Sequence, residues 1–564
     1  MEERQLTKVN PREPDVVMRL ARLGSFHQSR LSFMRVLLRR LTSEAWAFET
    51  QNFDIDAKGV GVAVYTARGP RRSYSLIAFA NDLPPEKRLD RVIATEWDAT
   101  FTLFDGVPEV ADIARLSKNI PKQEAGRVTE SELSVSRANR SARLWDYVVG
   151  CLADGRQPSA EKVRDVGYLM RTTAVYGSGK LGAADREWTC DRGEFLAPFQ
   201  IEMLTVYLIR AFVMDLVEHM ARSRAPETAV PLEPELRRSF GIGNSTGLGM
   251  APFLINHPVL LNNWIAAREE ALARVRSVES VEASIRDVFR RYVGRARKNV
   301  ELWRSDHEMQ KKKLSLLSND LDCLLKHLED EGLDGVRPWD RLWLWAENAL
   351  STEGQEQLGS LLLEPYPELV DGLSDCMSAD EAPQMRIDGT MSVGRLKAVV
   401  REIYGWALEI DWDAPEAQAW IWYTSEEKLE PRLGERSDGD LNQYEQPLGA
   451  GRDVVRMFAT LSKTDTETVA AFVMRHPEHR HSARRAQIAA RFPYAEIRDN
   501  TIASDMLPID LLRAKLSFFG AGHFDPRSER WVRVNMFQNA PFPNDLANEA
   551  ADDWTLPQLD EEDR

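Results

Sequence analysis

The sequence has little cysteine: four in 564 residues, with no CxxC pair. A disulfide framework or a cysteine zinc site needs clustered thiols, so this spacing argues against both. Scattered thiols are typical of a reducing compartment, and we therefore predict a cytoplasmic protein. The four residues are Cys151, Cys190, Cys323 and Cys376.

Long apolar runs are also missing. No stretch of about 18 uncharged apolar residues occurs, so we expect no membrane partner. The first residues, MEERQLTKVNPREPD, are charged and lack the apolar centre of a secretory signal. The composition is otherwise ordinary for a folded chain, with 43% apolar and 29% charged residues.

Positive charge is in deficit, because the formal net charge is −15. Nonspecific binding of nucleic acid needs a positive field over the phosphates, so nucleic acid is not an expected partner. Acidic residues concentrate at the end of the chain, where they far outnumber the basic ones. We predict a disordered acidic tail over residues 546–564.

The rest of the chain divides into three predicted segments: 1–107, 108–335 and 336–545. The first combines an amphipathic helical region with strand-like runs, and the short connections between these runs favour antiparallel pairing. The strand-like runs are residues 59–67, 74–82 and 91–106.

The second segment has helical periodicity, and the third mixes helices with aromatic, highly charged stretches. The periodic stretches of the second segment are 131–152, 160–176, 195–223 and 258–330. The predicted fold class is thus α+β and predominantly α-helical. It has a small antiparallel sheet near the N-terminus, a helical middle and a mixed C-terminal part.

Leucines form a regular stripe at the end of the second segment, including Leu317, Leu321, Leu324 and Leu328. Two interpretations follow from this spacing. The helices of 258–330 form an antiparallel bundle within the chain, or they form a coiled-coil contact that makes a homodimer.

Glycines cluster in FGIGNSTGLGMAPF, residues 240–253. A dinucleotide fingerprint fails here, because the third glycine comes one residue late and the preceding PLEPELRRS has a helical pattern. A P-loop fails for lack of its Lys-Ser/Thr ending. Asn244, Ser245 and Thr246 are natural helix-capping residues, and exposed amides at a helix start favour an anion.

His257 follows this loop and precedes Pro258, a residue favoured in the first turn of a helix. One interpretation makes residues 244–246 and His257 a substrate-binding loop. The other makes them a structural turn between helices, with His257 as a hydrogen-bonded core side chain.

A second glycine cluster is RTTAVYGSGKLGAADRE, residues 171–187. Ser178 and Lys180 lie between its glycines, and a lysine on such a loop can hold a carboxylate or phosphate. The alternative is a helix-ending turn with a solvated lysine. Because glycine costs chain entropy, two such loops exceed what helix packing requires, and we expect both to face one pocket.

Charged residues crowd into WYTSEEKLEPRLGER, residues 422–436. The preceding tryptophans favour partial burial, which would adjust the pKa of Glu426 or Glu427 for acid–base catalysis. Arg432 and Arg436 would then bind an anionic substrate. A solvated loop is the competing interpretation.

Histidines concentrate in HPEHRHSARR, residues 476–485. His476 and His479 can share a helical face, and we predict an acid–base role for them, against the alternative of a surface cluster. Their spacing matches none of the common zinc motifs, so no metal site is predicted. Arg498, in a charged turn further on, is a further candidate for binding an anion.

Together these motifs predict an enzyme that acts on a small anionic metabolite by general acid–base chemistry. The sequence leaves the reaction type open among lyase, hydrolase and transferase, and it identifies no cofactor. The alternative is a noncatalytic assembly or regulatory protein that dimerises through its long helices.

Overall fold

The computed structural model describes most of the chain in separate ranges. These are residues 8–84, 96–121, 129–172, 191–197, 199–247, 257–303, 305–330, 333–378, 386–415, 422–425, 431–433, 443–445, 450–461, 463–498, 509–520, 524–526, 531–546 and 554–557. Within these ranges, no helix combines the length and the apolar character needed to cross a membrane.

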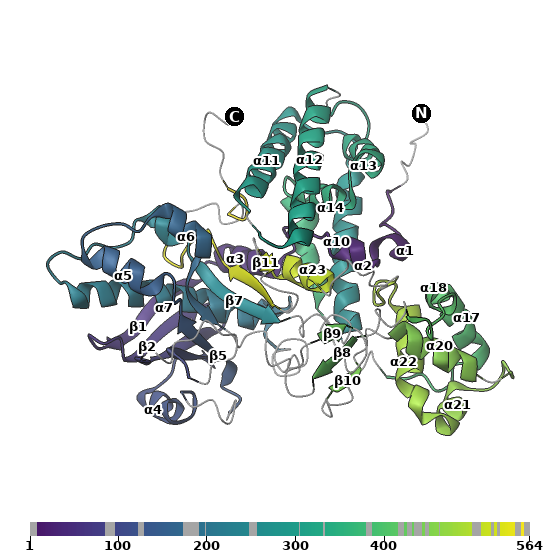
Figure 1. Ribbon diagram of the computed structural model, residues 1–564, viewed down its shortest axis with the longest axis horizontal. Helices are drawn as coiled ribbons and strands as arrows, with labels where there is room; N and C mark the ends of the chain where they lie inside the picture. Colours follow the sequence, from purple (N-terminus) through teal and green to yellow (C-terminus); the bar gives the residue numbers. More distant parts are fainter. Residues whose placement is uncertain are drawn as a thin grey trace.

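A nine-stranded sheet forms one half of the molecule (Figure 1). Its strand order is β1-β2-β3-β4-β5-β6-β7-β12-β11. The strands are β1 (Ala47–Ile55), β2 (Gly61–Arg68), β3 (Ser73–Ala80), β4 (Ala99–Asp105), β5 (Glu132–Arg140), β6 (Tyr168–Thr172), β7 (Gly241–Gly247), β11 (Phe524–Pro526) and β12 (Trp531–Met536). All neighbours are antiparallel except β6 and β7, which are parallel.

The mixed α and β character agrees with the prediction, but the small N-terminal antiparallel sheet was wrong in size and extent. The sheet contains a parallel pair and takes strands from all three predicted segments. Pairing between strands far apart in sequence depends on tertiary contacts, and local periodicity carries no signal for it.

Two stretches predicted as helical contain strands. Residues 131–152 begin with β5 before the helix α5 (Trp145–Ala153), and residues 160–176 contain α6 (Ala160–Val166) and then β6. Two serines of β5 are buried and hydrogen-bonded, Ser136 across the sheet and Ser134 to α7. Ser136 Oγ lies 2.8 Å from Thr172 Oγ1, and Ser134 Oγ lies 2.6 Å from Thr205 Oγ1. Such buried polar residues remove the alternation that marks a strand.

The glycine stretch that we interpreted as a helix-capping turn is the strand β7. Its glycines are required for packing. A Cβ on Gly241 would lie 2.5 Å from the carbonyl oxygen of Met536, and one on Gly243 would lie 2.5 Å from the ring of Tyr168. The preceding PLEPELRRS does contain a helix, α8 (Pro234–Arg238). His257 directly precedes α10 (Pro258–Arg276), with Pro258 in the first turn as predicted.

Helices cover the sheet and build the second half of the molecule (Figure 1). The helix α7 (Gln200–Arg224) is buried along most of its length and packs on β2 to β5 and β7. The helix α4 (Val110–Asn119) packs on the other face, where Leu116 meets Ile77 and Phe104. The other helices before residue 380 are α1 (Pro14–Val17), α2 (Leu20–Leu23), α3 (Phe33–Ser43), α11 (Ala283–Leu302), α12 (Glu308–Asp330), α13 (Pro338–Ala349), α14 (Thr352–Leu361) and α15 (Pro367–Val370).

The leucine stripe of α12 is buried inside the chain. Leu317, Leu321, Leu324 and Leu328 belong to the main hydrophobic core, and α12 packs on α11 and α14. This packing agrees with the bundle interpretation for these leucines, and the homodimer stays a prediction.

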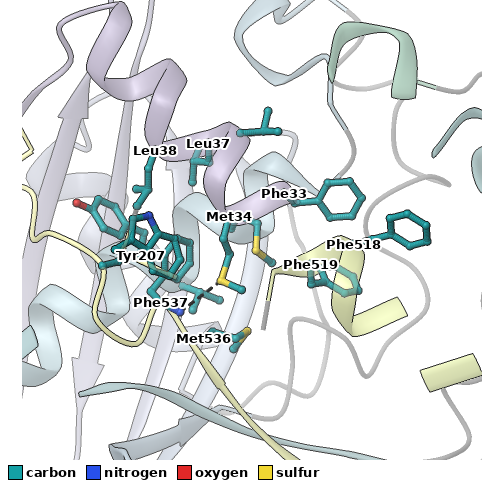
Figure 2. Packing of buried hydrophobic residues seen from close by; sticks show 14 of the residues in the cluster. Phe33, Met34, Leu37, Leu38, Tyr207, Phe518, Phe519, Met536 and Phe537 are labelled. Atoms are coloured by element: carbon teal, nitrogen blue, oxygen red, sulfur yellow. Dashed lines mark hydrogen bonds between the residues drawn. The ribbon is translucent and has the colours of Figure 1, made fainter. Parts of the chain in front are cut away.

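The main core joins the sheet to the helical half. Figure 2 shows Phe33 and Met34 of α3 between the C-terminal residues Phe518 and Phe519 on one side and Met536 and Phe537 on the other. Phe519 lies on α23 (Ile509–Phe519), and its ring centroid is 5.4 Å from that of Phe33. Residues from both ends of the chain thus share one core.

A separate helical unit follows in the C-terminal segment, at the lower right of Figure 1. It has a hydrophobic core of its own. Its helices are α17 (Val393–Ile403), α18 (Gly405–Leu408), α20 (Ala450–Thr460), α21 (Val469–Arg475), η7 (Pro477–His479) and α22 (Arg480–Arg491). A small antiparallel sheet of β8 (Trp422–Ser425), β9 (Pro431–Leu433) and β10 (Gln443–Glu445) lies between these elements in sequence.

Residues 554–557, which lie within the predicted tail, pack on the body of the molecule. Trp554 is buried, and its ring stacks 6.3 Å from that of Phe537. Arg295 Nη2 donates to the carbonyl of Leu556 at 2.6 Å. One tryptophan among acidic residues supplies enough apolar surface to hold this short piece on the body.

Candidate functional site

The helix α14 has polar side chains where a buried helix ordinarily has apolar ones. Its buried polar residues are Glu353, Gln355, Glu356, Gln357 and Ser360. Burying a charge is costly unless it is paired and hydrogen-bonded. The buried polar side chains of α14 therefore need charged or hydrogen-bonding partners nearby, and these partners define the candidate site.

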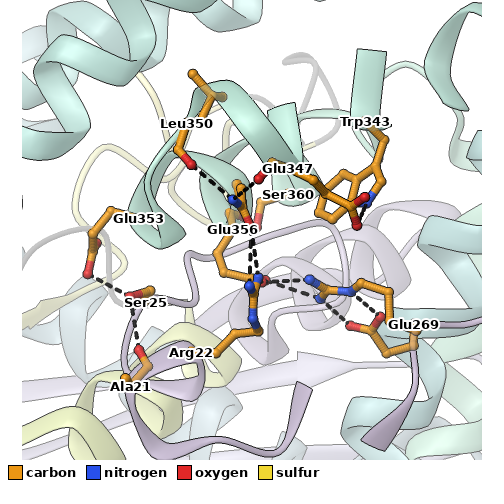
Figure 3. Close-up of polar contacts among 12 residues, drawn as sticks. Ala21, Arg22, Ser25, Glu269, Trp343, Glu347, Leu350, Glu353, Glu356 and Ser360 are labelled. Atoms are coloured by element: carbon orange, nitrogen blue, oxygen red, sulfur yellow. Dashed lines mark hydrogen bonds and ion pairs between the residues drawn. The ribbon is translucent and has the colours of Figure 1, made fainter. Parts of the chain in front are cut away.

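Glu356 is the centre of a buried cluster of arginines and glutamates, shown in Figure 3. Its carboxylate accepts from Arg12 Nη1, Arg22 Nη1 and Arg268 Nη2, each at 2.7 Å. Arg12 also binds Glu269 through two hydrogen bonds of 2.7 Å. Burial pushes the pKa of Glu356 upward, but the charges of Arg12 and Arg268 outweigh it and hold this pKa below its ordinary value of 4.5.

Glu353, one turn earlier, is the centre of a second cluster. Its carboxylate accepts from Ser25 Oγ at 2.8 Å, Lys313 Nζ at 2.8 Å, and Arg513 Nη1 and Nη2 at 2.7 and 2.9 Å. Against the effect of burial, Arg513 holds the pKa of Glu353 well below its ordinary value. Asp510 lies 3.3 Å from the same Lys313, and burial raises its pKa.

His27 lies at the edge of the Glu353 cluster. Its Nε2 is 3.6 Å from Glu353 Oε2, is shielded from solvent, and has no hydrogen-bond partner in the described chain. Burial lowers the pKa of His27 below 6.5, so the imidazole is neutral at pH 7. A neutral imidazole beside a fixed carboxylate is suited to proton transfer, and such contacts often tighten only when substrate is bound.

A pocket opens beside His27, between α2–α3, α11, α14 and α23. Its cavity volume is about 40 Å³, which is enough for a few water molecules or a small polar group. Gln28 in its wall donates from Nε2 to the Thr555 carbonyl, while its Oε1 is shielded and has no partner among the described residues. The pocket is lined by Phe26, His27, Gln28, Asn299, Trp303, Gln357, Leu361, Glu364, Arg513, Leu516, Ser517, Thr555 and Leu556.

Among the described residues, the ion clusters near the pocket contain more basic than acidic side chains, although the whole chain is acidic, and of these residues Arg513 and Glu364 line the pocket itself. A third cluster, in which Arg35 binds Glu364 at 2.6 Å and Arg30 binds Asp371 at 2.8 Å, belongs to the same surroundings. The basic members are Arg12, Arg22, Arg30, Arg35, Arg39, Arg268, Lys313 and Arg513, and the acidic members are Glu269, Glu353, Glu356, Glu364, Asp371 and Asp510. This excess favours an anion in the pocket.

The helix α23 carries a further titratable group, Lys515. Its Nζ lies 5.5 Å from the centroid of the Phe519 ring, and burial lowers its pKa to about 7. Lysines with such values act as bases or nucleophiles in enzymes.

The predicted glycine-loop residues lie elsewhere, in the large sheet. Asn244 is on β7 and only 2% exposed, and its Nδ2 has no hydrogen-bond partner in the described chain. Ser245 and Thr246 follow on the same strand and pair with β12. His257 is half-buried before α10. The strand β6, which ends at Thr172 where the second glycine cluster begins, is parallel to β7.

The predicted histidine pair lies in the helical unit. His479 Nε2 is 3.1 Å from Thr460 Oγ1, and its ring stacks on Phe472, while His476 Nδ1 is 3.4 Å from Glu478 Oε1. Burial lowers the pKa of His479. The contacts of His479 join η7 to α20 and α21.

Arg498 ties the end of this unit to the N-terminus, because it forms an ion pair with Asp15 and its amide donates to the Met18 carbonyl at 2.7 Å. Arg432 is on the strand β9, opposite Tyr423. The other predicted residues lie outside the described ranges: Ser178, Lys180, Glu426, Glu427 and Arg436.

No group of three or more histidine, cysteine, aspartate or glutamate side chains suited to a metal ion occurs in the described part of the chain. Comparison with known proteins finds no match to this chain among family models, curated proteins or solved structures.

Proposed function

We propose that the chain is an enzyme that acts on a small anionic molecule by acid–base chemistry, with its site in the pocket beside His27. The observation that carries the proposal is His27 itself: a neutral imidazole in a pocket wall, whose Nε2 lies next to Glu353 and has no hydrogen-bond partner among the described residues. A buried polar atom without a partner costs free energy, and active sites commonly carry this cost.

Each residue of the site has a proposed role. His27 takes up or releases the proton, and Glu353, held by Arg513 and Lys313, is the positioning residue that stabilises its charged form. The positive excess of the described clusters near the pocket attracts the anion, and the amide of Gln357 in the pocket wall provides a polar contact for its orientation.

Binding tests the proposal directly. Wild-type protein is screened by thermal shift against small carboxylates and phosphate esters, and the strongest stabiliser is then titrated by calorimetry. We expect His27→Gln to weaken its binding about 10-fold or more, because a hydrogen bond to a charged group is lost. His481→Gln, at an exposed histidine of α22, is the matched control. Equal binding by wild type and His27→Gln would refute the assignment.

The low pKa of His27 also predicts how stability depends on pH. The folded state keeps the imidazole neutral, whereas the unfolded chain takes up a proton near pH 6.5. The stability contribution is therefore complete above pH 6.5 and decreases as the pH falls toward the folded-state pKa, by at most about 1.4 kcal/mol per pH unit. His27→Gln should lack this loss.

Melting temperatures of wild type and His27→Gln between about pH 5 and 8 measure the effect. We expect wild type to lose stability relative to the variant on the acidic side. A constant difference across the range would contradict the prediction.

A further inference from the structure

Arg137, far from the pocket in sequence, lies on β5 and has no counterion among the residues that the structure describes. In the described chain it has no ion pair and no hydrogen bond, and its Nε is shielded from solvent. Its strand neighbour Glu132 shows the usual arrangement, since it binds Arg115 of α4 at 2.6 Å. Burial lowers the pKa of Arg137, and no nearby acid opposes this effect.

The guanidinium is held in place by an aromatic ring. Arg137 Cζ lies 4.1 Å from the centroid of the Trp97 ring, close enough for a cation–π contact. A guanidinium that stacks in this way keeps its edge free for planar hydrogen bonding to a carboxylate or phosphate.

A second polar group without a partner lies directly beside it. Thr100 of β4 is opposite Arg137 in the sheet register, and its Oγ1 is buried and bonded to nothing described. On its other side Thr100 is opposite the buried Phe79 of β3. The row Phe79–Thr100–Arg137 thus places a half-buried cation next to a buried hydroxyl, with Phe79 and Trp97 as apolar neighbours that strengthen a hydrogen bond to an anion.

We propose that Trp97, Thr100 and Arg137 form a binding site for an oxyanion group, carboxylate or phosphate, of a small soluble molecule. The anion would accept two hydrogen bonds from the Arg137 guanidinium and one from the Thr100 hydroxyl. Binding of the anion would satisfy the buried polar atoms of Arg137 and Thr100 and would give the Arg137 guanidinium a counterion. The site is distinct from the His27 pocket, and either one can exist without the other.

Calorimetric titration with inorganic phosphate and with succinate tests the proposal and separates the two chemistries. We expect wild type to bind at least one of them, and Arg137→Met to weaken that binding about 10- to 100-fold. Arg137→Lys keeps the charge but loses the planar edge, so its binding should be intermediate. Binding that is lost in Arg137→Met but kept in His27→Gln belongs to this site, whereas binding that is lost in His27→Gln belongs to the pocket.

A second readout separates a binding role from a structural one. In buffer without these anions, Arg137→Met should melt at or above the wild-type temperature, because it removes a desolvated charge that has no partner. Arg68→Met, at an exposed arginine paired with Glu49, is the charge-matched control and should leave binding unchanged. If neither anion binds, or if both bind wild type and Arg137→Met equally, the proposal is wrong.

Discussion

Glu356→Gln should destabilise the packing of α1 and α2 on α14 by about 3–5 kcal/mol. The substitution keeps the shape of the side chain but leaves Arg12, Arg22 and Arg268 with one counterion fewer in a buried place. Removing one partner from a buried ionic cluster is costly because the remaining charges stay desolvated. The loss is therefore far larger than that of a surface ion pair.

Hydrogen exchange of the α14 amides, resolved by mass spectrometry, measures this loss locally, which suits a chain too large for one two-state transition. Glu49→Gln removes the carboxylate of an exposed ion pair with Arg68 and should cost less than about 1 kcal/mol. Similar exchange in the two variants would show that the cluster is not stabilising.

The contribution of Glu356 has a definite pH dependence. Its folded pKa is lowered, so the contribution is complete above its ordinary pKa of 4.5 and is lost as the pH falls through the folded value. The difference between wild type and Glu356→Gln should thus be constant near neutrality and shrink in acid.

Gly241→Ala should also be strongly destabilising, by about 1–3 kcal/mol or more. The added Cβ would lie 2.5 Å from the Met536 carbonyl oxygen and 3.1 Å from the Gln538 amide nitrogen. Both obstacles are backbone atoms, so no rotamer change relieves the clash, and β7 must separate from β12.

Gly150→Ala is the matched control for this substitution. Gly150 lies inside α5 with no atom within 4 Å of the added Cβ, so alanine should stabilise that helix by up to about 1 kcal/mol. Urea unfolding compares the two variants. A Gly241→Ala midpoint equal to that of wild type would contradict the role assigned to this glycine.

Periodicity in the sequence predicted the long helices and the hairpin strands well, because these elements show their burial in local patterns. The prediction of helices over 258–330 corresponds to α10, α11 and α12, and the strand-like runs correspond closely to β2, β3 and β4. Prediction from periodicity failed at β7, because glycines and polar residues of this kind normally indicate a turn. Only the close approach of Tyr168 and Met536 explains those glycines.

The candidate site was missed for a related reason. Residues 352–361, TEGQEQLGSL, resemble any exposed polar helix, and nothing in them shows that Glu353 and Glu356 are buried. Their partners Arg12, Arg22 and Arg513 lie 160 to 344 residues away along the chain. Charge pairing over such separations becomes visible only in three dimensions. The acid–base roles predicted for Glu426, Glu427, His476 and His479 stay predictions.

The pairing of β7 with β12 has a consequence during synthesis. At about 5–20 residues per second, a ribosome needs roughly 15–60 s to make the roughly 280 residues between Gly247 and Trp531. During that time one edge of β7 lacks its final neighbour, and such edges invite pairing with other nascent chains. A strand of sequence GIGNSTG can bury little apolar surface against a wrong strand. Pairing of its open edge with another nascent chain is therefore only weakly stabilised while the last strand is still being made.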